Sequence, residues 1–216
     1  LIPLLFWRKR FSQTEIRSKS KRSLFNQNLI RPVVLFSMLG IGFMLVEISL
    51  IQRFVLFLGQ PVLSMTALLF SLLVGAGIGS MCSGRLASDK IIKGITIAAA
   101  FIVAILLIYT FLLPVIFEQL LGLGLTIRLL ATIVMLIPLG FCMGFPFPLG
   151  IKLLREMRME DHIPWMWGIN GICSVLGSAM TIVIAISLGF TEALLIGAFC
   201  YFLVFLVFRK RSIKKV

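Results

Sequence analysis

The sequence predicts an all-α fold, a polytopic integral membrane bundle of six complete transmembrane helices. Six apolar stretches approach the roughly 20 residues that a helix needs to cross the hydrocarbon core. The chain is 60% hydrophobic with a mean hydropathy of +1.10. Nineteen of its 21 lysines and arginines fall on one side of the implied membrane. Cytoplasmic loops carry such an excess of positive charge, so the asymmetry also predicts the orientation.

The apolar stretches divide the chain into three parts. Residues 1–31 are predicted to be the end of a truncated helix and a basic cytoplasmic linker, 32–208 a six-helix transmembrane domain, and 209–216 a basic cytoplasmic tail. Both termini are then cytoplasmic, and a bacterial inner membrane is the expected location. The predicted spans are 33–51, 62–84, 91–113, 126–147, 165–188 and 191–208.

The first residues predict that the chain continues a longer protein. Residues 1–7 are apolar and are followed by Arg8, Lys9 and Arg10. A cleavable signal peptide has the reverse order, so this start reads as a span that leaves the membrane. The basic residues from 8 to 22 are expected to lie against anionic lipid headgroups, each with about 1 kcal/mol of attraction.

The distribution of the net charge of +13 argues against nucleic acid binding, and the spacing of the cysteines argues against metal binding. Positive residues flank the spans, where they act as topology signals, so we expect no nucleic acid partner. The four cysteines lie in different spans or at their ends, and His162 is the single histidine. Because no metal-ligand spacing is present, we expect no metal, cofactor or disulfide.

The first span contains Glu47, the only acid in the interior of a predicted span, since Glu192 stands at the second residue of the sixth. A carboxylate at mid-helix costs about 2.5 kcal/mol or more, so such groups usually face a partner charge or a water-filled path. Arg53 lies about 600° further around the same helix and is therefore an unsuitable partner. Arg128, in the fourth span, could reach Glu47 if the two helices are neighbours. The alternative is a hydrogen-bonded acid that locks helices together. The apolar residues 54–58 make continuation of this helix to Leu58 the alternative to an end at Ile51.

Small residues in the second span predict close helix packing. Gly75, Gly79 and Ser83 are four apart, and a parallel stripe begins at Ala76. A phosphate-binding loop would need a preceding strand, so that reading is rejected. Stripes of this kind let two backbones approach each other. The third span is expected to end at Pro114, whose ring interrupts regular helical bonding.

The fourth span ends in two prolines, Pro146 and Pro148. They predict a kink or a helix stop, with a hinge as the alternative. The residues that follow, 152–161, have apolar positions spaced for a short amphipathic helix on the membrane surface.

Polar and small residues open the fifth span. Trp165 and Trp167 mark the headgroup boundary, and they precede Asn170, Ser174 and Ser178. Polar and small groups in a span serve contacts between helices, and Asn170 is expected to bond to another helix.

Several motifs resemble one known family. They are GIGFMLVE at 40–47, QRFVLFLG at 52–59, GFPFPLG at 144–150, PWMWGING at 164–171 and SVLGS at 174–178. Together they resemble the C-terminal membrane region of multi-pass spermidine-synthase-like proteins, over residues 31–208. In that family an aminopropyltransferase-like or SAM-dependent methyltransferase-like soluble domain is joined to membrane helices. The resemblance implies such a domain of the same parent chain as a partner.

The family's nucleotide-binding sheet and acidic catalytic residues have no counterpart in this chain. We therefore expect no catalytic residue here, and predict a non-catalytic domain that anchors its parent and handles a small cation such as a polyamine. Residues 84–93 are similar to the loop between the second and third spans of major facilitator transporters, with Asp89 as its acid. The alternative is therefore a six-helix half of such a transporter, with Glu47 as its proton or cation site.

Overall fold

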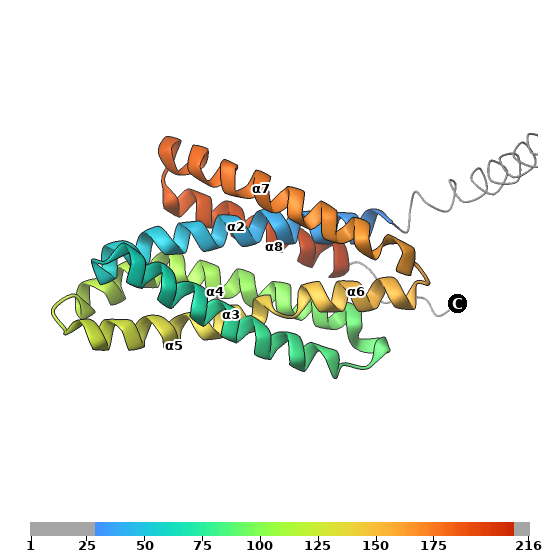
Figure 1. Ribbon diagram of the computed structural model, residues 1–216, viewed down its shortest axis with the longest axis horizontal. Helices are drawn as coiled ribbons and strands as arrows, with labels where there is room; N and C mark the ends of the chain where they lie inside the picture. Colours follow the sequence, from blue (N-terminus) through green and yellow to red (C-terminus); the bar gives the residue numbers. More distant parts are fainter. Residues whose placement is uncertain (1–28, 210–216) are drawn as a thin grey trace, which may run out of the picture.

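The computed structural model describes residues 29–209 and confirms the all-helical bundle (Figure 1). All regular elements in this part of the chain are helices. The two predicted segments at the ends, 1–28 of the truncated helix and basic linker and 210–216 of the basic tail, lie outside the described residues. The long helices are α2 (Ile30–Leu58), α3 (Pro61–Gly84), α4 (Ile91–Leu120), α5 (Leu125–Met143), α6 (Pro146–Glu156), α7 (Ile163–Ser187) and α8 (Phe190–Arg209), with short 3-10 turns η1 (Ser88–Lys90) and η2 (Glu160–His162).

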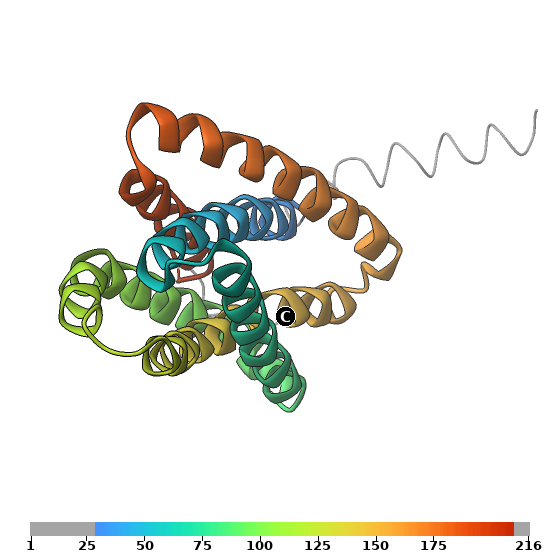
Figure 2. The same cartoon turned by 60° about the vertical axis from the view of Figure 1, so that its left-hand side comes forward.

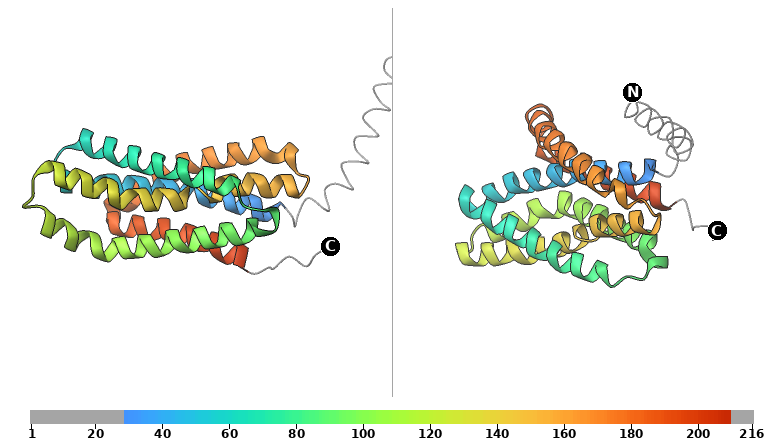
Figure 3. Two further views of the ribbon diagram at one scale, coloured as in Figure 1. Left: turned by 90° about the horizontal axis from the view of Figure 1, so that it is seen from below. Right: turned by 45° about the vertical axis from the view of Figure 1, so that its right-hand side comes forward.

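Six helical segments are long and apolar enough to cross a membrane, and α5 and α6 together form one of them. The helices run along one axis, with their connections at two ends (Figure 3). At one end α3 joins α4 and α6 joins α7; we call it the basic end. Only Arg53 and Arg128 lie toward the opposite end, among the described lysines and arginines.

Helix α2 is the centre of the bundle. It contacts α7 and α8 most extensively and also meets α3, α5 and α6. Half of the residues in its most apolar window are buried, against 11% in α7. Figure 2 shows α7 lying along α2, apart from α3 and α5. Helix α7 is therefore the peripheral span, and α2 joins the two sides of the molecule.

Helix α4 passes through Pro114 and ends at Leu120, so the prediction that this span ends at Pro114 was wrong. Continuing through the proline leaves one helical hydrogen bond unmade. A helix end inside lipid would leave several backbone groups without partners, which costs more. Helix α2 does continue to Leu58, where Gly59 ends it with a φ of 75°. Glycine adopts that left-handed conformation without a steric penalty.

The fourth span is broken between α5 and α6. Helix α5 ends at Met143, and α6 begins at once with Pro146 as its first residue. Proline is tolerated there because the first-turn N–H has no helical partner. The predicted surface helix at 152–161 was wrong, because α6 contains its first half and ends at Glu156. Leu149 and Leu154 of α6 are buried against the bundle and do not face lipid.

Candidate functional site

Glu47, Arg53 and Arg128 are the charged residues that the sequence singles out, and the two arginines have hydrogen-bond partners. The guanidinium Nη2 of Arg53, late in α2, donates to Thr191 Oγ1 at 2.7 Å. Glu192, in the first turn of α8, also attracts this arginine electrostatically. Arg53 therefore ties the end of α2 to the start of α8. A hydrogen bond to an ionised group is among the stronger kinds.

Arg128 near the start of α5 is held at the same end of the bundle. Its Nη1 donates to the carbonyl oxygen of Phe57 at 2.8 Å, while its Nε is buried without a partner. The last carbonyls of a helix lack helical partners and carry partial negative charge, so a guanidinium is favourable there. The suggested contact between Arg128 and Glu47 is not formed. Phe57 lies ten residues beyond Glu47, about 15 Å along α2.

Glu47 lies in the middle of α2 and is half-buried. Within the described residues its carboxyl group has no hydrogen bond and no ion pair. The alternative of a hydrogen-bonded lock between helices is therefore not formed in this part of the chain. Tyr201 of α8 is close enough to interact with it electrostatically. An unpaired carboxyl group inside a span is costly. Packing alone therefore does not explain why the chain has an acid at position 47.

Two further polar groups near the α2–α8 contact lack partners. Ser49 is fully buried, and its Oγ forms no hydrogen bond. Tyr201 packs its ring beside Gly42 and is 2% exposed. Its hydroxyl has no hydrogen-bond partner within residues 29–209, whereas the other tyrosine, Tyr109, donates to the carbonyl of Met135. Buried tyrosine hydroxyls usually find a partner.

Sequence reasoning missed Tyr201 and Ser49. The signal that could have found Tyr201 is its isolation as one of only two tyrosines, in the middle of the apolar sixth stretch. Tyr201 and Glu47 make a candidate polar site on α2 and α8. Ser49 lies about 200° around α2 from Glu47 and belongs to another face of the helix. A carboxyl near an aromatic hydroxyl can exchange a proton or bind a cation.

The small residues of α3 lie at its crossing with α5. A Cβ on Gly75 would come within 2.5 Å of the Ile137 carbonyl oxygen, and one on Gly79 within 2.1 Å of that of Phe141. Ser83, the third member, is buried and bonds within its own helix to Ser80. Gly75 and Gly79 therefore hold two backbones in contact.

The polar residues of α7 play different parts. Asn170 Nδ2 donates to the carbonyl of Phe36 on α2 at 3.0 Å. Ser174 lies beside Gly40 of α2, and its hydroxyl bonds to its own helix. Ser178 also bonds within α7, to Val175, and this contact is exposed. Asn170 is the residue of the three whose side chain joins two helices by a hydrogen bond.

The remaining candidates lie apart from the polar site. Pro146 and Pro148 occupy the first turn of α6, beyond the break in the fourth span. Cys82, Cys142, Cys173 and Cys200 are free thiols. No cluster of three or more histidine, cysteine, aspartate or glutamate side chains that could hold a metal occurs within residues 29–209.

Comparison with known protein families, curated proteins and solved structures found no match to this chain. The resemblance to spermidine-synthase-like membrane regions therefore stays a prediction from the motifs quoted above.

Proposed function

We propose that this chain is the membrane-embedded, non-catalytic domain of a spermidine-synthase-like multi-pass protein, and that it handles a small cation at Glu47. The anchoring role is supported by six helices that can cross a membrane. The soluble synthase-like domain of the same parent chain is its proposed partner. The basic end faces the cytoplasm of a bacterial inner membrane in this proposal, as the lysine and arginine distribution favours.

One observation carries the cation-handling part. Of the three charged residues Glu47, Arg53 and Arg128, both arginines have hydrogen-bond partners, while Glu47 has neither a hydrogen bond nor an ion pair among residues 29–209. An acid that only fastened helices together would be bonded to one of them. A bound cation would supply the missing partner. Tyr201 supports a cation such as a polyamine, because its hydroxyl oxygen can accept a hydrogen bond from an ammonium group.

Equilibrium binding tests this proposal directly. The full chain, reconstituted in lipid nanodiscs, is titrated with radiolabelled spermidine. Glu47→Gln preserves the shape of the side chain and removes its charge, so we expect at least about tenfold weaker binding, equivalent to about 1.4 kcal/mol. Glu118→Gln is the matched control, because Glu118 is an exposed carboxyl near the end of α4. Equal affinity for the wild type and Glu47→Gln would overturn the role of Glu47.

The arrangement of the helices favours a second candidate, a six-helix half of a major-facilitator-like transporter. The first three spans, α2, α3 and α4, correspond in order to the last three, which are α5 with α6, α7 and α8. Exchanging each span with its counterpart turns the α2–α7 contact into the α3–α5 contact and leaves the α4–α8 contact unchanged. The α2–α8 contact likewise becomes that of α4 with α5 and α6. The exchanged spans run in opposite directions. Inverted repeats of this kind occur in secondary transporters, with binding sites near the membrane midplane.

Transport into proteoliposomes separates the two candidates. A transporter half accumulates labelled spermidine under an imposed proton gradient, and Glu47→Gln abolishes the accumulation while the protein stays folded. A membrane domain that only binds the cation gives the binding result without accumulation. Translation of the DNA upstream of the codon for Leu1 adds a second distinction, between a soluble nucleotide-binding domain and a matching second set of helices.

A further inference from the structure

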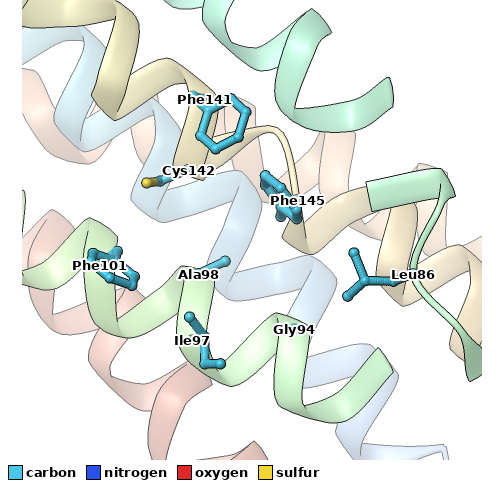
Figure 4. A pocket seen from close by; sticks show the side chains of 8 residues that line it. All are labelled: Leu86, Gly94, Ile97, Ala98, Phe101, Phe141, Cys142 and Phe145. Atoms are coloured by element: carbon cyan, nitrogen blue, oxygen red, sulfur yellow. The ribbon is translucent and has the colours of Figure 1, made fainter. Parts of the chain in front are cut away.

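An apolar pocket of about 270 Å³ lies between α4 and the broken fourth span (Figure 4). It is separate from Glu47 and Tyr201. Three parts of the chain form its walls. They are Leu86 just after the end of α3, one face of α4, and the end of α5 with the break that follows it. The residues that line it include Leu86, Gly94, Ile97, Phe101, Phe141 and Phe145.

The mouth of this pocket opens toward the lipid. Ile97 and Phe101 lie at its edge with 44% and 57% of their surfaces exposed, and both belong to the spanning part of α4. Gly94 leaves space where a side chain would otherwise approach Leu86. Apart from the thiol of Cys142, every residue that lines it is apolar. Such a space excludes water and small polar ligands, and hydrocarbon fills it favourably.

Positive charge lies directly above the mouth, at the basic end. Lys93, Ile97 and Phe101 are four residues apart, which places them in one row on α4. Lys93, Lys90 and Arg85 are all exposed. The rise from Ile97 to Lys93 is about 6 Å.

Two acids near this cluster reduce its positive charge, and a further base adds to it. Asp89 is exposed in the same turn, and Glu156 accepts a hydrogen bond from Ser88 Oγ. Lys152 donates to the carbonyl of Leu86 and adds a fourth positive charge. Four positive charges therefore stand against two negative ones.

We propose that this pocket binds an acyl chain of an anionic phospholipid, whose phosphate lies against Lys90, Lys93 and Arg85. Both halves of the ligand are specified by the site. The apolar lining takes hydrocarbon, and the cluster above it takes a negative headgroup at the membrane surface. A zwitterionic lipid would fill the pocket equally well but gain less from the cluster. The site is independent of the proposed function at Glu47.

Quenching of tryptophan fluorescence by brominated lipids tests the proposal. The background chain carries Trp7→Phe, Trp165→Phe and Trp167→Phe, which removes all three native tryptophans. Phe101→Trp then places a reporter at the mouth. The protein is reconstituted in bilayers with increasing fractions of brominated phosphatidylglycerol or brominated phosphatidylcholine. We expect the pocket to favour the anionic lipid about threefold or more.

A reporter at the same depth on another helix is the matched control. Leu73 of α3 is 65% exposed and lies eleven residues from the end of α3 at Gly84, as Phe101 lies ten from the start of α4 at Ile91. At Leu73→Trp we expect a ratio near one. Adding Lys90→Gln and Lys93→Gln should bring the ratio at position 101 down to the control value and leave the control unchanged.

The outcomes that overturn the proposal are equally direct. Equal ratios at positions 101 and 73 mean that the pocket selects no lipid. A high ratio at 101 that survives both lysine substitutions means that the cluster does not bind the headgroup. Ile97→Trp is a second reporter at the same mouth. It must show the same preference for the anionic lipid, so the test still stands if Phe101→Trp itself alters the pocket.

Discussion

Two helix crossings bring backbones equally close, but they are held in different ways. At the α3–α5 crossing, glycines on both helices face the backbone of the other, and Gly140 would place a Cβ within 2.5 Å of the Leu72 carbonyl oxygen. At the α2–α7 crossing, Gly40 approaches the Asn170 carbonyl at the same distance. Yet α7 is the least buried span, and an asparagine hydrogen bond supplements its packing.

This difference teaches that close approach and tight confinement are separate properties. Four such glycines lie at the α3–α5 crossing (Gly75, Gly79, Gly140 and, just beyond α5, Gly144), against two at the α2–α7 crossing, Gly40 and Gly177. Helix α7 touches mainly α2 and α8, and most of its surface has no protein neighbour. It can shift outward at a smaller cost. The predictions below use pairs of variants to test this, with the free energy of unfolding measured by denaturant titration or steric trapping in bicelles.

The largest effect is expected at Gly79. A methyl group there meets the Phe141 carbonyl oxygen at 2.1 Å, the shortest such approach at either crossing. Gly79→Ala should therefore destabilise the protein by about 3 kcal/mol. Gly77→Ala is the control on the same helix, because nothing lies within 4 Å of that position. It should be neutral or slightly stabilising, since alanine favours helix. Similar losses for the two variants would contradict the packing described for α3.

A smaller effect is expected at Gly40, although the clash has the same kind of partner. Gly40→Ala should cost about 1 to 2 kcal/mol, because α7 can move away and relieve the overlap. Gly171→Ala on α7 is its control, as a Cβ there enters open space. If Gly40→Ala costs as much as Gly79→Ala, α7 is confined as firmly as α5, and the comparison fails.

The hydrogen bond of Asn170 should contribute less than the glycine packing. Asn170→Ala removes the donor to the Phe36 carbonyl, and bonds of this kind between spans contribute about 0.6 kcal/mol on average. Ser178→Ala serves as the control because its hydroxyl bonds only within α7. A double variant with Gly40→Ala should show a loss below the sum of the two, since a displaced α7 no longer forms the bond.

The smallest effect is expected at the end opposite the basic residues. Thr191→Val removes the acceptor for Arg53 and should cost about 0.5 kcal/mol, because this bond lies near the membrane surface. Thr66→Val is the control, since that exposed hydroxyl bonds within α3. The coupling energy between Thr191→Val and Arg53→Gln, measured by a double-mutant cycle, should equal most of the free energy of unfolding that Thr191→Val alone removes. Zero coupling would mean that the bond contributes nothing.

The six spans could be predicted because each apolar stretch is long and their order alternates with basic loops. What failed was the reading of proline. Pro114 is a breaker in water, but in hydrocarbon the helix continues because the backbone has no other partner. The residues after Pro148 were read as a separate surface helix because their pattern is amphipathic. That pattern instead reflects packing of α6 on α4 and α2.

The candidate site was only partly predictable. Glu47 could be singled out because it is the only acid in the interior of an apolar stretch, whereas its surroundings could not be predicted. Spans that are apolar on every face carry little information on which helices are neighbours. Arg128 was therefore matched to Glu47 and not to Phe57. Tyr201 escaped notice because an isolated tyrosine in an apolar span carries no charge to mark it.

The two arginine contacts at the far end have a consequence for where the carboxyl group stands in a bilayer. Arg128 fixes the last turn of α2 through Phe57, and Arg53 fixes the turn before it to α8. Glu47 lies ten residues further in than Phe57, about 15 Å, which is half of a hydrocarbon core of about 30 Å. If these clamps lie at the membrane surface, the carboxyl group stands about 15 Å inside it, near the midplane of the bilayer. Tilting of the surrounding helices, and not sliding of α2, would then decide which phase it meets.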